Sequence, residues 1–295
     1  MVSVGNNFFY TKSLPCSLWF FDKGKQEQLQ DKVLFIDARN YYTVVDRTLN
    51  EWSQWQLKNL NAIVWLYRGE KEKYSNLLTD YQQTTATMLG DIYNLDQCFD
   101  IRLGEDKLAE IKAKAAVLQT MSFTDELQSL HALQSGLNEL KTMANETVKE
   151  VIADYESMTK SDYKALQAQI KEINGFTLGA VATVKKVLNN SAAEAAAKID
   201  ELLTVLEEAA WLYEKFGTGK YADIAGLCKI ASVEEIKEKN YSLTPGAYVG
   251  VAAEEDDGID FKERMTEIHK EMLELQAESD RLMQTISKNW EELGL

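Results

Sequence analysis

The chain begins with two short apolar, aromatic-rich segments, residues 17–21 and 33–37, that predict β-strands, and most of the remaining chain has helical periodicity. Two strands alone are only marginally stable in water. We therefore expect this pair to belong to a larger sheet, whose remaining strands lie upstream of Met1 or in another chain. The predicted fold class is mainly α, with long helical hairpins or a coiled coil, a C-terminal helix and a small N-terminal remnant of a sheet.

Charge and composition exclude several functions. The formal net charge is −15 with a sequence pI near 4.7, and nucleic-acid affinity rests largely on Lys and Arg side chains that neutralise phosphates. The chain alone should bind DNA poorly. Cys16, Cys98 and Cys228 are far apart and lack metal-ligand or redox spacing, which is typical of buried thiols in a reducing compartment.

Targeting signals are not apparent in the sequence. The first residues lack the basic and apolar regions of a signal peptide, and no apolar run approaches the ~20 residues of a membrane span. We expect a soluble, cytoplasmic protein without a membrane partner.

Four regions succeed one another along the chain: two closing strands in 1–45, a helical region in 46–216, a turn-rich connector in 217–260 and a coiled-coil helix in 261–295. Within the helical region, Thr124, Ser161 and Ser191 are predicted helix starts, the last through a capping box with Glu194. A turn is predicted at Gly175 and Gly179. A 3-4 spacing typical of a helical hairpin or coiled coil joins Leu130, Leu133, Leu137, Leu140, Ala144, Val151 and Met158.

The connector begins near Phe-Gly-Thr-Gly-Lys at 216–220, which superficially has the look of a Phe-x-Gly-x-Gly cofactor loop. It comes after a predicted helix and not a strand, so a helix-ending glycine turn is favoured. Ser232 and Glu235 form a further predicted capping box.

The last region carries a long, narrow apolar ladder, interrupted at Ser279 and Asn289. Such a seam requires a partner helix. The partner is either the 105–158 helices of this chain or another subunit. The predicted docking residues are Phe261, Met265, Ile268, Met272, Leu275, Leu282, Ile286 and Leu293.

Several motifs together carry a resemblance to a known family. Residues 6–21, which include Asn-Asn-Phe-Phe-Tyr-Thr and Leu-Trp-Phe-Phe, and residues 33–39, Val-Leu-Phe-Ile-Asp-Ala-Arg, resemble the end of the catalytic domain of type I restriction-modification methyltransferase (M) subunits. Residues 241–250, which contain Pro-Gly-Ala-Tyr-Val-Gly, resemble a later family segment, with Ala247 where arginine is common. The resemblance covers about 1–75 and 210–295, so the helices between look like an insertion or a subfamily feature.

The resemblance implies that the N-terminal strands are the remnant of a Rossmann-like sheet of an adenine-N6 DNA methyltransferase. The complete family enzyme uses S-adenosylmethionine and an Asn/Asp-Pro-Pro-aromatic loop that grips the flipped adenine. Pro15 and Pro245 are the only prolines and are not adjacent, so that loop is absent from this sequence. We expect no catalytic residue and no cofactor bound by this chain alone.

Three aromatic residues, Phe8, Phe9 and Tyr10, lie where the resemblance places the entrance to the base pocket. An aromatic ring there would stack on an extruded adenine, but core packing against the missing sheet is the commoner role. Asn6 and Asn7 either contact a base edge or shape a turn. His131 and His269 have no second ligand at metal spacing, so no metal site is predicted.

The preferred hypothesis is a C-terminal fragment, or an internal-start product, of a type I M subunit, acting by docking to the specificity (S) subunit. The resemblance implies the S subunit, the full-length M subunit and the restriction subunit as partners, with DNA reached only through the complex. Two alternatives are open: one half of a split adenine-N6 methyltransferase, or an independent helical scaffold that competes with the full M subunit.

Overall fold

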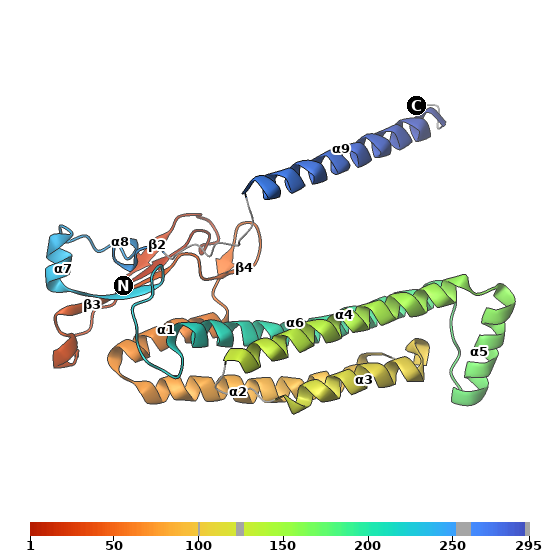
Figure 1. Ribbon diagram of the computed structural model, residues 1–295, viewed down its shortest axis with the longest axis horizontal. Helices are drawn as coiled ribbons and strands as arrows, with labels where there is room; N and C mark the ends of the chain where they lie inside the picture. The colour runs from red at the N-terminus through yellow and green to blue at the C-terminus, as the bar shows by residue number, and fades with distance from the viewer. Residues whose placement is uncertain (100, 122–126, 252–260, 293–295) are drawn as a thin grey trace. The chain divides into compact units, whose positions relative to one another are not determined.

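The computed structural model describes residues 1–99, 101–121, 127–251 and 261–292 (Figure 1). They form two units, residues 1–251 and residues 252–295, the second represented by helix α9 (Phe261–Glu292). The first unit joins a small sheet to long helices. The chain is therefore mainly helical with a small sheet near its N-terminus, as the sequence predicts.

The sheet has four strands in the order β2-β1-β3-β6. Strand β1 (Val2–Val4) pairs antiparallel with β2 (Cys16–Leu18) and parallel with β3 (Lys32–Ala38). Strand β6 (Cys228–Ser232) adds antiparallel to the other side of β3. The first predicted strand is shorter than expected, because residues 19–21 lie outside β2. Two strands of this sheet, β1 and β6, were not predicted.

Strand β3 lies between β1 and β6, and both of its faces are buried. Leu34, Ile36 and Ala38 face the helices and belong to the main hydrophobic core, whereas Phe35 points to the other face and stacks on Tyr248 with ring centroids 4.0 Å apart. Tyr248 lies in the short helix α8 (Gly246–Val249), which comes after α7 (Val233–Glu238). An uninterrupted apolar run is what a strand buried on both faces requires.

A hairpin and two helices come after β3 in the chain. Strands β4 (Thr43–Val44) and β5 (Asn50–Glu51) pair antiparallel. Helix α1 (Gln54–Arg68) begins with a capping box between Ser53 and Gln56 and ends at Gly69, whose φ of 74° favours glycine. Helix α2 (Lys71–Tyr93) comes next, and the single turns Glu27–Leu29, Leu95–Cys98 and Ile101–Leu103 are 3₁₀ helices.

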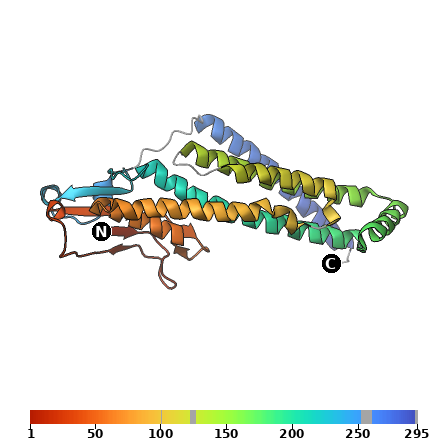
Figure 2. The ribbon, with the colours of Figure 1, turned by 90° about the horizontal axis from the view of Figure 1, so that it is seen from below.

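Four helices form a long projection that we call the arm: α3 (Glu105–Thr120), α4 (Leu127–Ser157), α5 (Lys160–Asn174) and α6 (Val181–Phe216). Helices α4 and α6 run antiparallel and side by side (Figures 1 and 2), since Lys141 pairs with Asp200 and Glu156 pairs with Lys185. The predicted seam is confirmed from Leu130 to Ala144, but Val151 is only partly buried and Met158 is exposed beyond the end of α4. Its buried members are Leu130, Leu133, Leu137, Leu140 and Ala144.

The structure gives a different outcome for each of the three predicted helix starts in this region. Thr124 lies outside the described residues. Helix α5 begins earlier than expected, because Thr159 and not Ser161 caps it by accepting from the Asp162 N–H at 3.2 Å. The start at Ser191 is wrong: this residue is buried in the middle of α6. The turn at Gly175 and Gly179 is confirmed, since it separates α5 from α6.

A buried polar cluster joins the arm to the N-terminal region. Asn59 on α1 donates to the backbone carbonyl oxygen of Glu208 on α6 at 2.9 Å, and the Tyr41 hydroxyl donates to the Glu208 carboxylate. Tyr81 on α2 donates to the Asn59 side-chain oxygen at 2.9 Å. Burial raises the pKa of the Glu208 carboxyl, and hydrogen bonds from Tyr41, Gln56 and Asn59 oppose that rise. Four segments of the chain are thus joined by a hydrogen-bond network around Asn59 and Glu208.

Candidate interaction site at the open edge of the sheet

The sheet ends at β2, and this edge is open. In the order β2-β1-β3-β6, β2 has β1 on one side and no further strand on the other among the described residues. An exposed edge presents unpaired backbone N–H and C=O groups, which are a template for another strand. The outer side of Cys16–Leu18 is therefore a ready position for strand addition.

Exposed apolar side chains surround this open strand. We call them the aromatic edge: Phe9, Tyr10, Leu14, Leu18, Trp19, Phe20 and Phe21. Tyr10 is 90% exposed, Phe21 86% and Phe20 72%. So many large apolar groups within 13 residues of sequence exceed the scattered exposure that is ordinary on protein surfaces, which makes this segment the candidate interaction site.

The predicted base-stacking residues lie at the start of this surface. Phe8 is half-buried and packs against Trp52, with ring centroids 4.8 Å apart, and against Tyr42 at 5.9 Å. Phe9 and Tyr10 are exposed in the loop before β2. The three rings therefore do not form one stacking platform, and only Phe9 and Tyr10 are available to a ligand or partner.

The preceding asparagines shape the backbone. Asn50 donates its backbone N–H to the Asn7 carbonyl oxygen at 2.7 Å and its side-chain N–H to that of Asn6 at 2.9 Å. Asn7 adopts a φ of 63°, a left-handed conformation that asparagine tolerates well. This geometry matches the turn interpretation of the pair.

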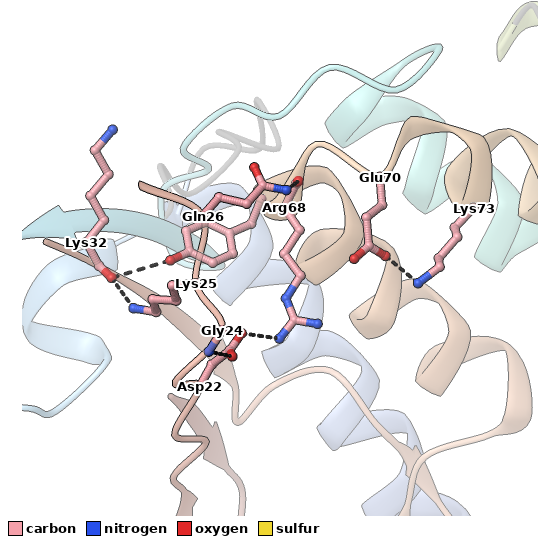
Figure 3. Close-up of polar contacts among 9 residues, drawn as sticks. Asp22, Gly24, Lys25, Gln26, Lys32, Arg68, Glu70 and Lys73 are labelled. Atoms are coloured by element: carbon pink, nitrogen blue, oxygen red, sulfur yellow. Dashed lines mark hydrogen bonds and ion pairs between the residues drawn. The ribbon is translucent and has the colours of Figure 1, made fainter. Parts of the chain in front are cut away.

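A second polar cluster holds the loop between β2 and β3 against the junction of α1 and α2 (Figure 3). Arg68 pairs with Asp22 at 3.0 Å, and Asp22 also accepts from the Gly24 N–H at 2.8 Å. The Lys32 carbonyl oxygen accepts from Lys25 at 2.6 Å and from the Tyr67 hydroxyl at 3.3 Å. Exposed pairs of this kind contribute little stability each, but together they fix where β2 leaves the sheet.

The opposite edge of the sheet is closed by its own chain. The outer side of β6 is occupied because the Cys228 N–H donates to the Ile224 carbonyl oxygen and the Ile230 N–H donates to the Asp223 carboxylate, both at 3.0 Å. Burial also raises the pKa of the Cys228 thiol to about 11, so this cysteine is an inert core thiol, whereas Cys16 and Cys98 are only half-buried. Among the described residues, the uncovered edge of the sheet is therefore the one at β2.

The glycine turn after α6 is filled by a side chain. Gly217 caps α6, and its carbonyl oxygen accepts from the Tyr74 hydroxyl at 2.8 Å. A Cβ atom at Gly219 would lie 2.8 Å from the Tyr74 ring. The predicted helix-ending role of this turn is confirmed, since Gly217 is the C-cap of α6.

Helix α9 carries the predicted docking ladder. The ladder side chains that the structure describes, Met265, Ile268, Met272, Leu275, Leu282 and Ile286, are between 43% and 61% exposed. Phe261 belongs to the helix, but its side chain is outside the described set, and Leu293 lies outside the described residues. Whether these residues dock to a partner stays a prediction.

The part of the chain that contains β1, β2 and β3 is similar to known proteins. Residues 1–94 match the family model N-6 DNA Methylase. This class of enzyme is the one whose closing strands the N-terminal motifs resemble. The N-terminal part of the chain is thus similar to a DNA methylase of the M-subunit type.

Two curated relatives indicate which kind of DNA methylase this part of the chain resembles. The chain is 46% identical over 74 residues to the methylase subunit of the type I restriction enzyme HindI from Haemophilus influenzae. It is 41% identical over 69 residues to the methylase subunit of the type I restriction enzyme MjaIX from Methanocaldococcus jannaschii. The matches cover 25% and 23% of this chain, and 17% and 12% of the relatives. No solved structure matches the chain.

Two further properties of the described residues concern membrane-spanning helices and metal-binding groups. Among the described residues, no helix is sufficiently long and apolar to cross a bilayer. The same part of the chain contains no group of three or more His, Cys, Asp or Glu side chains placed to bind a metal ion.

Sequence reasoning missed two buried or edge-covering carboxylates: Asp223, which covers the outer side of β6, and Glu208, which joins the arm to the N-terminal region. Asp223 looks like one of many surface carboxylates, and only the pairing of β6 with β3 reveals that it accepts from Ile230. Glu208 lies in a helix rich in glutamate, so its burial is hidden as well. A spacing signal existed for Glu208, since its neighbours Val205, Ala209 and Leu212 are apolar at helical intervals.

Proposed function

We propose that this chain is the C-terminal part of a type I DNA adenine methyltransferase subunit, which works inside a modification or restriction complex and not alone. The observation that carries the proposal is the open, aromatic edge at β2, within the stretch that matches a DNA methylase family. A methylase sheet that stops at this edge needs further strands to cover Trp19, Phe20 and Phe21.

Docking to the specificity subunit is assigned to α9. An isolated amphipathic helix is marginal in water, and the exposed seam of α9 offers a surface for pairing with helices of that subunit. Ser279 interrupts the seam, and a polar residue at such a position sets the register of helix pairing at some cost in stability. DNA is reached through the assembled complex.

The decisive experiment is co-expression of the chain with the S subunit and with the full-length M subunit, followed by native mass measurement. The proposal expects a stable assembly that contains this chain and S. A double change, Ile268→Asp with Leu275→Asp, should abolish the assembly, because carboxylates on an apolar seam are costly to bury. The helical signal of the arm should remain.

A matched control uses the same helix. Leu273→Asp with Ala277→Asp adds the same two charges on the face of α9 away from the ladder, at exposed positions, and should leave binding unchanged. Intact binding by the seam variant, or no complex of the unmodified chain with S, would refute the docking assignment.

A second candidate, one half of a split methyltransferase, is favoured by the edge itself, because the open side of β2 can accept strands from a separate polypeptide. Calorimetry with S-adenosylmethionine tests it. Activity that appears only after a second polypeptide is added would support the split. Binding of the cofactor by the isolated chain would contradict our expectation that the cofactor site lies elsewhere.

A competing non-enzymatic role is a scaffold that occupies the S subunit in place of the full M subunit. The same mass measurement separates it from the preferred role. Assemblies in which this chain and full-length M exclude each other would identify the scaffold.

A further inference from the structure

Helix α5, which closes the end of the arm, carries a stripe of lysines. Lys160, Lys164 and Lys171 are four and seven residues apart, so at 3.6 residues per turn they lie within about 40° of one another around the helix. All three side chains are exposed. The stripe extends for about 16 Å along the helix axis.

The buried face of α5 does not compete for this stripe. Tyr163 is buried, its hydroxyl donates to the Gly179 carbonyl oxygen at 2.7 Å, and the half-buried Leu166 and Ile170 continue the same apolar face. Lysine and apolar positions thus occupy different sides of the helix. The stripe is presented to solvent by a helix whose orientation is fixed by packing.

The carboxylates of α5 lie elsewhere on the helix. Asp162 and Glu172 are about 80° or more from the stripe by helical rotation, and Asp162 accepts from the hydroxyl of the capping residue Thr159 at 2.7 Å. Neither carboxylate forms an ion pair with the stripe in the described structure. The stripe therefore keeps its full positive charge.

Other lysines of the arm are treated differently. Six of them pair with carboxylates within 4 Å, namely Lys107, Lys112, Lys114, Lys141, Lys185 and Lys198. At the inner end of α6, Lys215 lies over the Trp211 ring. Across the described arm, the other lysines without a carboxylate partner are Lys149, Lys160, Lys164, Lys171 and Lys186. Positive charge is thus largely neutralised along the inner arm and left free toward its outer end.

This distribution is unusual for so acidic a chain. Residues 159–187 contain five lysines and two carboxylates, while the whole chain carries a net charge of −15. The Debye length at physiological ionic strength is about 8 Å. Helix α4, at about 46 Å, separates the end of the arm from the sheet by several such lengths, so the carboxylates near the sheet are screened from α5.

We propose that the stripe on α5 binds the phosphate backbone of duplex DNA, without reading its sequence, when the chain is part of its complex. This inference rests on the proposed function, which brings DNA to the assembly. Duplex DNA carries one negative charge per about 1.7 Å of axis, so a stripe of about 16 Å meets several phosphates. Three lysines give weak affinity by themselves, and tethering within a complex supplies the effective concentration that makes such a contact count.

The test compares three variants of the assembled complex, with a fluorescent duplex of arbitrary sequence as the probe. The stripe variant is Lys160→Gln, Lys164→Gln and Lys171→Gln. The slope of log affinity against log salt should become shallower by about 2 to 3, since each lost phosphate contact contributes about 0.9. The corresponding arginine variant keeps the charges and should keep the slope.

The matched control neutralises three paired lysines of the same arm, Lys107→Gln, Lys112→Gln and Lys114→Gln. Exposed ion pairs of this kind contribute little to stability, so the fold should persist and the slope should not change. An equal change of slope in both variants would mean a general charge effect and would overturn the inference.

A footprint supplies an independent readout. Acetylation of lysines, followed by mass spectrometry, should show Lys160, Lys164 and Lys171 protected by duplex DNA and Lys112 unprotected, in the complex and, at low salt, in the chain alone. If no complex with S forms, the proposed function fails while the footprint of the chain still decides this inference. If the complex forms but slope and footprint are unchanged, or the stripe variant only prevents assembly, the stripe does not bind DNA.

Discussion

The sheet end and the arm solve the same problem of covering apolar surface in opposite ways. Around β2, large aromatic side chains such as Phe20 and Phe21 remain exposed. In the arm, the seam between α4 and α6 is closed, and Leu137 and Leu140 are fully buried. The family match lies at the sheet end, within residues 1–94, whereas the arm lies outside it. The matched region thus contains the exposed aromatic surface, whereas the arm packs its apolar side chains into a core that it shares with α1 and α2.

The sharpest way to break this comparison is to place the same charge in both regions. Leu140→Asp should unfold the arm or lower its free energy of unfolding by more than about 4 kcal/mol, because it removes a buried side chain and buries a carboxylate. Urea unfolding followed by circular dichroism measures the effect.

The counterpart at the sheet end is Phe20→Asp. Phe20 is 72% exposed, so the free energy of unfolding of the isolated chain should change by less than about 0.5 kcal/mol. A large loss of stability in this variant would show that the aromatic edge is already covered within the chain.

An effect smaller than that of Leu140→Asp is expected from a change inside the sheet. A Cβ atom at Gly5 would lie 2.6 Å from the Arg39 carbonyl oxygen, and a backbone atom cannot move aside as a flexible side chain can. Gly5→Ala should therefore cost about 1–3 kcal/mol. Gly90→Ala, on the open surface of α2 where nothing lies within 4 Å, is the control and should be neutral or stabilising. Thermal unfolding of both variants decides the matter.

The difference between the two sheet edges is open to a direct test. Asp223→Ala removes the acceptor for the Ile230 N–H and should cost about 1 kcal/mol, while it also exposes the outer side of β6. Asp223→Asn retains an acceptor oxygen and should lose less. Sedimentation should reveal concentration-dependent association of the alanine variant. Identical behaviour of both variants would show that Asp223 does not protect the outer side of β6.

The smallest expected effect is a pH dependence. Burial raises the folded-state pKa of Glu208 above its unfolded value, so its contribution to stability is complete below the unfolded pKa and is lost as pH rises through the folded one. Glu208→Gln has no such loss. Its advantage over the unmodified chain should grow as pH rises above the ordinary glutamate pKa of 4.5 in denaturant titrations, and a constant difference would contradict the assignment.

Local patterns predicted the elements whose partners are near in sequence. The seam of α4, the turn at Gly175 and the cap at Ser232 are consequences of spacing and capping rules, and Ser232 accepts from the Glu235 N–H at 3.2 Å. Ser191 misled the same rules, because a Ser-x-x-Glu pattern inside a helix is overridden when packing buries the residue and continues the helix.

Elements that depend on distant partners were not visible in the sequence. Strand β6 lies in a turn-rich stretch, and only its pairing with β3 makes it a strand. The site was predictable in part: the aromatic residues were singled out, but Phe8 turned inward onto Trp52 while Phe9 stayed exposed. In an irregular loop, sequence spacing does not determine which side chains point inward and which point outward, because the loop has no regular period.

The pairing of Ile36 with Cys228 determines how strongly the sheet depends on the length of the arm. This contact closes a loop that contains the whole arm, yet the entropy of closing a loop grows only with the logarithm of its length, at about 0.6 kcal/mol per doubling. A change in the length of the outer α4–α6 hairpin, whose two helices pack against each other, therefore alters that cost little. The sheet therefore tolerates arms of very different length between the same two strands, and a shortened α4–α6 hairpin, trimmed by equal numbers of turns, should still let β6 find β3.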